Sequence, residues 1–173
     1  MARLEQPQRD PPMKILLAAD GSRFTQIAAR HLVNHVQWFA KPPEVHVLHV
    51  HPPLPYPAAS SAVGKATVEK YQREESLAAL AVAEKELAAG GVAYTSSWAV
   101  GDVAQEIARH VKEHGIDLVI MGSHGHGALA NLALGSVATK CVATLDVPVM
   151  IVRNALPPKP LSRREKTYGP RKS

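Results

Sequence analysis

A short apolar strand that ends abruptly in a glycine loop is the feature that constrains this sequence most. Residues 117–121 are apolar after the leading aspartate, and Gly122 and Gly125 follow at once. A helical pattern then begins at Gly135 and Ser136. Glycines let a backbone approach a ligand without a Cβ in the way, and the unpaired N–H groups of a first helical turn attract anions. The stretch therefore predicts an anion site, with phosphate as its usual occupant.

Strands and helices alternate along the whole chain. Short apolar runs predict strands at residues 13–19, 45–50, 92–100, 117–121 and 147–152. Apolar residues that recur every three or four positions predict helices at residues 23–40, 66–89, 103–114 and 136–145. The helix at 66–89 is expected to bury a stripe that includes Tyr71, Leu77 and Leu80. Such alternation implies parallel strands joined by right-handed crossovers. We therefore predict an α/β fold with a single doubly wound five-stranded parallel sheet and helices on both faces.

One domain accounts for the length of the chain. Its 173 residues, 46% apolar and 20% charged, suit one globular unit, which we place at 13–153. Residues 1–12 are expected to be a disordered N-terminal segment, and residues 154–173 a basic, Pro-rich disordered tail. The sequence has no apolar run long enough for a membrane span, and its first residues lack the apolar stretch of a signal peptide. A cytoplasmic location without a membrane partner is therefore expected.

The formal net charge of +5 belongs to the tail. Residues 154–173 carry six basic side chains and one acidic side chain, whereas residues 1–153 balance. We interpret the tail as a solubilising end, with a weak contact to nucleic acid or to an acidic partner as the alternative. Nucleic acid is not the expected partner. The lone cysteine, Cys141, cannot form an internal disulfide and is interpreted as a buried apolar group.

The spacing of the loop resembles a known signature. Gly122, Gly125, Gly135 and Ser136 form the pattern G-x2-G-x9-G-S, which is similar to that of the ATP-binding branch of the universal stress protein family. The stretches ILLAADGSRFTQIAARHL, VHVLHV and VGDVAQEIARHVKEHGIDLVIMGSHG are similar to other parts of that family. The resemblance covers residues 13–152. It implies an adenine nucleotide alpha hydrolase-like fold with strand order 3-2-1-4-5, whose ligand site lies between the first and fourth strands.

The resemblance also implies a function and its partners. It indicates a nucleotide-dependent regulatory dimer of the stress response that holds ATP together with Mg²⁺ or Mn²⁺ and signals to an unknown protein partner. The apolar last strand, residues 147–152, is expected at a sheet edge because it contains Pro148, and the resemblance implies that two such edges pair in a homodimer.

The resemblance assigns roles to individual residues at this site. The phosphates would rest on the loop and helix amides, the base on the first two strands, and the ribose or a metal ion on Asp20. The nucleotide-binding residues implied are Ala18, Ala19, Asp20, Val50, Met121, Gly122, Ser123, His124, Gly125, Gly135, Ser136 and Val137. For Asp20 the alternative is a carboxylate that caps the following helix. A valine at Gly122 or Gly135 is expected to abolish binding with little loss of fold, partly by straining a positive φ.

Two other classes of function stay open: an ATP-hydrolysing enzyme of the same fold, and an interaction module that binds no nucleotide. Residues 122–136 contain no lysine, arginine, aspartate or glutamate, and the sequence has no G-x-x-x-x-G-K-[ST] motif. No catalytic residue is therefore predicted, and turnover is expected to be slow at most. The intact glycine pattern weighs against the module.

The nine histidines are interpreted as structural. His31 and His35, and likewise His110 and His114, stand four residues apart on predicted helices, but no third ligand accompanies either pair in sequence. His124 and His126 differ because they lie in the glycine loop, where a protonated imidazole could meet a phosphate oxygen.

Overall fold

The chain forms one parallel sheet between two layers of helices. The structure, a computed structural model, describes residues 11–53, 64–126 and 134–153. Its sheet contains β1 (Lys14–Ala18), β2 (Glu44–His51), β3 (Tyr94–Val100), β4 (Leu118–Gly122) and β5 (Val149–Val152). All strand pairs are parallel, in the order β3-β2-β1-β4-β5. The predicted fold class and strand order are therefore confirmed. The expected end segments lie largely outside the described residues.

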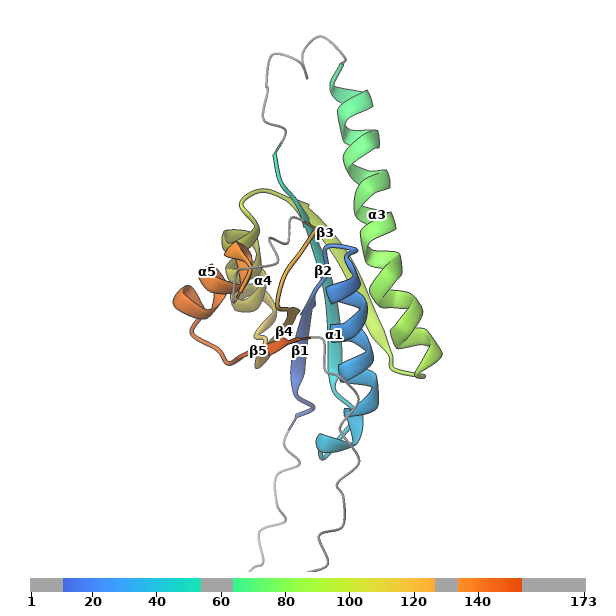
Figure 1. Cartoon of the computed structure of the whole chain (residues 1–173), viewed down its shortest axis with the longest axis vertical. Coiled ribbons are helices and arrows are strands. Elements are labelled where there is room, and N and C mark those ends of the chain that lie inside the picture. The colour runs from blue at the N-terminus through green and yellow to red at the C-terminus, as the bar shows by residue number, and fades with distance from the viewer. Residues whose placement is uncertain (1–10, 54–63, 127–133, 154–173) are drawn as a thin grey trace, which may run out of the picture.

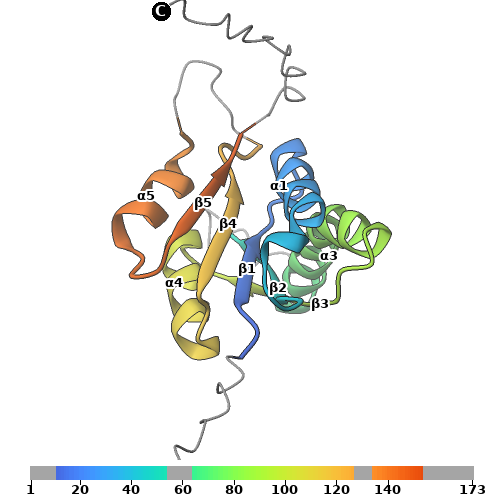
Figure 2. The ribbon, with the colours of Figure 1, turned by 90° about the horizontal axis from the view of Figure 1, so that it is seen from below.

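Each strand sends alternate side chains to opposite faces, which creates two cores. Ile15 and Leu17 of β1 belong to the core beneath α1 (Arg23–Asn34) and α3 (Lys65–Ala89), whereas Leu16 belongs to the core beneath α4 (Val103–His114) and α5 (Ser136–Thr144). Figures 1 and 2 show these two helical layers on either side of the sheet. The three β1 side chains are fully buried, as the continuous apolar run predicts.

The first helix is shorter than its periodicity predicts. α1 ends at Asn34 and is followed by the 3-10 turn η1 (Val36–Trp38). The His35 ring lies 2.7 Å from the carbonyl oxygen of His31, and the Gln37 amide donates to the carbonyl of Asn34 at 2.9 Å. These side chains bond carbonyls of the last helical turn, which have no intrahelical partner, so the helix can end there.

The buried face of α3 also differs from the prediction. Gln72, Ser76, Leu80, Ala83 and Leu87 are buried, whereas Tyr71 and Leu77 are each 49% exposed. Gln72 and Ser76 are each one position from the exposed Tyr71 and Leu77, so the helix is turned by about one residue from the predicted face, although its N-terminal part extends past the end of the sheet (Figure 1). Among the described residues, no helix combines the length and the apolar character needed to span a lipid bilayer.

Candidate functional site

A cavity of about 550 Å³ lies at the carboxyl ends of the central strands. This edge is where the chain leaves β1 toward β2 on one side and leaves β4 toward β5 on the other, the usual ligand position in open α/β sheets. Its volume is in the range typical of small-molecule sites. Its lining consists of Ala18, Ala19, Asp20, Thr25, Leu48, His49, Val50, Pro52, Val103, Ile107, Met121, Gly122, His124, Gly125, His126, Gly135, Ser136, Val137 and Ala138.

Every residue that the resemblance assigned to the site lines this cavity except Ser123. Ser123 is buried, its N–H donates to the carbonyl of Val152 at 3.0 Å, and its carbonyl accepts from the N–H of Gly135 at 2.8 Å. These two bonds tie the end of β4 to the end of β5 and to the start of α5. Ser123 therefore fixes the position of the loop without lining the cavity.

Asp20 stands at the end of β1 and organises the turn into α1. Its Oδ1 accepts hydrogen bonds from the Ser22 N–H at 2.9 Å and from the Thr25 hydroxyl at 2.7 Å. Burial raises the pKa of Asp20, but these hydrogen bonds and the nearby His126 outweigh it and hold the pKa below its ordinary value. Asp20 is thus a carboxylate at neutral pH.

The alternative role predicted for Asp20, that of capping α1, is filled by Ser22. The Ser22 hydroxyl accepts from the N–H groups of Phe24 and Thr25, and this makes Ser22 the N-cap of α1. Asp20 supports that cap from outside the helix, with its second carboxylate oxygen toward Gly125.

The loop glycines are required for close approach rather than for unusual backbone angles. Neither Gly122, Gly125 nor Gly135 has a positive φ, so the expected strain at such an angle is wrong. A Cβ at Gly122 would lie 2.5 Å from the Cβ of Phe24, and one at Gly125 would collide with the Asp20 carboxylate. Gly122 therefore serves the packing of α1 on β4, and we now expect its replacement to destabilise the fold.

The N-terminus of α5 opens into the cavity without a capping side chain. Gly135 is its N-cap and has no side chain to bond the amides of the first turn. Ser136, Val137 and Ala138, the first three residues of the helix, all line the cavity. Their N–H groups have no carbonyl partner within the helix, and the helix dipole adds partial positive charge there. This arrangement can bind an anion.

His49, His124 and His126 place polar ring atoms in the lining of the cavity. The His49 ring bonds the Ala19 carbonyl at 2.8 Å, and burial lowers the pKa of His49. The His126 Nε2 lies 2.9 Å from the carbonyl oxygen of Asp20, and the His124 ring packs against Phe24 at 5.4 Å between centroids. Of the described residues lining the cavity, none is a lysine or an arginine.

Sequence reasoning missed the part of the lining that comes from elements far apart in the chain. Val103 and Ile107 of α4 form an apolar wall with Met121 of β4, and His49 comes from β2. Val103 and Ile107 read as ordinary core positions of an amphipathic helix. Only the strand order, which sets α4 over this end of the sheet, could have identified them.

The fold and the cavity define an α/β protein with an uncapped helix N-terminus facing a cavity at the switch point of its sheet. More narrowly, residues 12–153 match the Universal stress protein family, and the chain belongs to that family. It is 33% identical over 151 residues to universal stress protein YxiE of Bacillus subtilis, covering 81% of this chain and 98% of that protein.

Solved structures agree on the fold. The structure of MJ0577 has a TM-score of 0.69 at 28% identity, over 84% of this chain and 98% of that one. A family protein from Arabidopsis thaliana, solved with AMP bound, has a TM-score of 0.60 at 17% identity, over 86% and 98% of the two chains. These neighbours have the adenine nucleotide alpha hydrolase-like fold, which is the fold of this chain.

Proposed function

We propose that this chain binds ATP, with Mg²⁺ or Mn²⁺, in the cavity at the ends of β1 and β4. The single observation that carries the proposal is the uncapped N-terminus of α5 facing a cavity of about 550 Å³. Hydrogen bonds from helix amides to a charged group contribute about 1.5–3 kcal/mol each. The Arabidopsis relative with AMP bound supports an adenine nucleotide as the ligand.

The apolar end of the cavity suits the base. Ala19 donates its N–H to the Leu48 carbonyl, so the main-chain groups of Leu48 point toward β1. The β1–β2 ladder ends at Ala18 and Leu48, and Val50 lies two residues farther along β2. Alternate residues of a strand direct their main-chain groups to the same side. The N–H and C=O of Val50 therefore point into the space beyond the end of β1, where they can meet an adenine edge.

The main-chain groups of Ala19, which the resemblance also places near the base, are already hydrogen-bonded within the protein. The Ala19 carbonyl accepts from His49, and the Ala19 N–H is used by Leu48. We therefore assign the main-chain contacts of the base to Val50, with Ala18, Met121 and Ile107 as apolar contacts. No carboxylate other than Asp20 stands in the described lining, so nothing there favours the exocyclic amino group of guanine.

The phosphates would lie between the glycine loop and α5, and Asp20 is the group that fits a metal ion. Asp20 is ionised at neutral pH, and oxygen ligands suit Mg²⁺. The ion would offset phosphate charge that no lysine or arginine of the described lining can meet. Rapid phosphoryl transfer also requires a lysine or arginine on the transferred group, and the described lining has neither. We therefore propose that occupancy rather than turnover is the output, read by a protein partner in the cytoplasm during stress.

Equilibrium binding of the full chain tests this function. Titration with ATP, AMP and GTP in the presence of Mg²⁺ should give one site that prefers both adenine nucleotides to GTP. Equal affinity for GTP would contradict the assignment of the base contacts. A steady-state ATPase rate above about 1 s⁻¹, in the range of ordinary enzymes, would favour an enzyme instead.

A further inference from the structure

Three histidines gather on the α4 side of the sheet, away from the nucleotide cavity. His46 is the third residue of β2, and His110 and His114 stand one turn apart in the last part of α4. One ring nitrogen from each of the three lies within 4.8 Å of the others. His46 thus supplies the third ligand whose absence in sequence led us to interpret the pair on α4 as structural.

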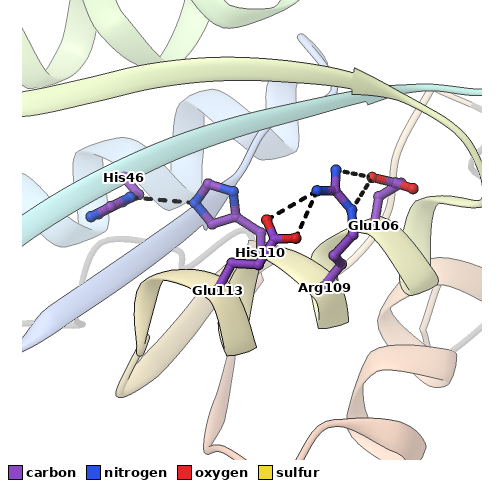
Figure 3. Close-up of polar contacts among 5 residues, drawn as sticks. All are labelled: His46, Glu106, Arg109, His110 and Glu113. Carbon is purple, nitrogen blue, oxygen red and sulfur yellow. Dashed lines mark hydrogen bonds and ion pairs between the residues drawn. The ribbon is translucent and has the colours of Figure 1, made fainter.

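We propose that His46, His110 and His114 form a binding site for a divalent transition-metal ion, for which Zn²⁺ is the probe. Figure 3 shows His46 reaching from β2 toward His110 on α4. Imidazole nitrogens suit zinc, copper and nickel better than magnesium or calcium. Three histidines with a fourth position left to water form a complete set for tetrahedral zinc.

The distance between the first two ligands fits one shared ion. His46 Nδ1 lies 3.3 Å from His110 Nε2. Two nitrogens bound to one tetrahedral zinc at about 2.0–2.1 Å each lie about 3.3 Å apart. In the metal-free chain the two nitrogens share a proton, and the ion would take its place. The third ligand, His114, is exposed. Its ring can therefore rotate to bring its nitrogen closer to those of His46 and His110.

A carboxylate behind His46 fixes the orientation of that ring. The Glu44 carboxylate accepts from His46 Nε2 at 3.1 Å. This bond places the ring proton on Nε2 and leaves the lone pair of Nδ1 directed at His110. Metal-binding histidines commonly donate their second ring N–H to a carboxylate, which sets the tautomer and raises ligand basicity.

Charges of both signs surround the cluster, and Lys14 Nζ donates to the His114 carbonyl at 3.1 Å. Arg109, the neighbouring base on α4, pairs with both Glu106 and Glu113 (Figure 3), so its positive charge is offset. Glu44 adds a further negative charge beside His46.

The pair of His31 and His35 at the end of α1 provides a control. His31 lies in the last turn of α1 and His35, four residues farther along, is its C-cap, with ring centroids 4.2 Å from each other. The described residues bring no third His, Cys, Asp or Glu ligand to them. If zinc bound to any two histidines four residues apart, replacing one histidine of either pair would therefore weaken binding equally.

The test is a zinc titration of the full, untagged chain after chelator treatment, without nucleotide. We expect one equivalent to bind at micromolar protein. His114→Ala, at an exposed position, should weaken binding at least tenfold, and Glu44→Gln about 10–100-fold, as for other outer-shell partners. His31→Ala should change nothing, and Co²⁺ at the site should give the intense visible bands of tetrahedral coordination.

Three results would overturn the site: no bound zinc, unchanged affinity in His114→Ala, or an equal loss in His31→Ala. A rise in the melting temperature on adding zinc, absent in His114→Ala, would support it by a measurement that needs no affinity. Because no step involves ATP, a failure here would leave the proposed nucleotide function untouched, and the reverse also holds.

Discussion

Gly122 is required by the packing of α1 on β4, independently of any ligand. A Cβ there would lie 2.5 Å from the Cβ and 2.9 Å from the carbonyl carbon of Phe24, at the start of α1. Gly122→Ala should therefore lower the free energy of unfolding by about 1–3 kcal/mol through overpacking. Urea denaturation measures this. Gly135→Ala is the control, because its Cβ comes no closer than 3.3 Å to another atom and should cost much less. Equal stability of the two variants would contradict the packing role of Gly122.

Cys141 is fully buried, and burial raises the pKa of its thiol to about 11. The stability that the buried, protonated thiol contributes to the fold is fully present below pH 9.0, the ordinary pKa of a cysteine. It is lost as the pH rises toward 11. The reactive species is the thiolate. The native chain should therefore react slowly with Ellman's reagent at pH 8 and rapidly in urea. Equal rates in the two conditions would show that the thiol is accessible and ionised in the fold.

At the scale of the element, the N-terminus of α5 carries the nucleotide proposal. Ser136 is the first residue of the helix, and Gly135 before it has φ −69° and ψ 158°, an extended conformation that a following proline requires. Ser136→Pro therefore removes one amide donor and the hydroxyl while the helix can still form. We expect ATP affinity to fall about tenfold or more, since a hydrogen bond to a charged group contributes about 1.5–3 kcal/mol.

Two further variants separate the causes of that loss. Ser136→Ala removes the hydroxyl alone and should have the smaller effect. Arg23→Pro makes the same change at the first residue of α1, after Ser22 with φ −73° and ψ 169°, and lies outside the cavity. It should leave ATP affinity unchanged. If Ser136→Pro binds ATP as tightly as the unaltered chain, the α5 amides do not hold the phosphates.

The sequence predicted elements best where a single pattern decided the structure. β1 and β4 were predicted to within a residue or two, because continuous apolar runs stop at Asp20 and at Gly122. The buried face of α3 was predicted only in part: Leu80 is buried as expected, but alanines around the helix weaken its periodicity, and Gln72 and Ser76 are buried in place of Tyr71 and Leu77. The histidine cluster could not be predicted from spacing. His46 and His110 are 64 residues apart, and only the packing of α4 on β2 joins them.

At the scale of the whole molecule, β5 is an edge strand, and we predict that two copies pair through it. The carbonyls of Pro148 and Val152 accept from β4, so the main-chain groups of Ile151 face away from the sheet. Light scattering should show a dimer at micromolar concentration. Ile151→Pro removes an outward N–H without breaking the β4 ladder and should give a folded monomer, whereas Ile151→Val should stay dimeric. A monomeric unaltered chain would contradict this assembly.

Binding of an adenine nucleotide in the cavity between β1 and β4 can be tested residue by residue. The most direct measurement is the change in backbone amide resonances when ATP and Mg²⁺ are added to the isotopically labelled full chain. We expect saturable shifts concentrated at Val50, at Gly122 to Gly125 and in the first turn of α5, with few changes in α3. Shifts that are absent at saturating ATP, or that map to another surface and leave Ser136 and Val137 unmoved, would contradict it.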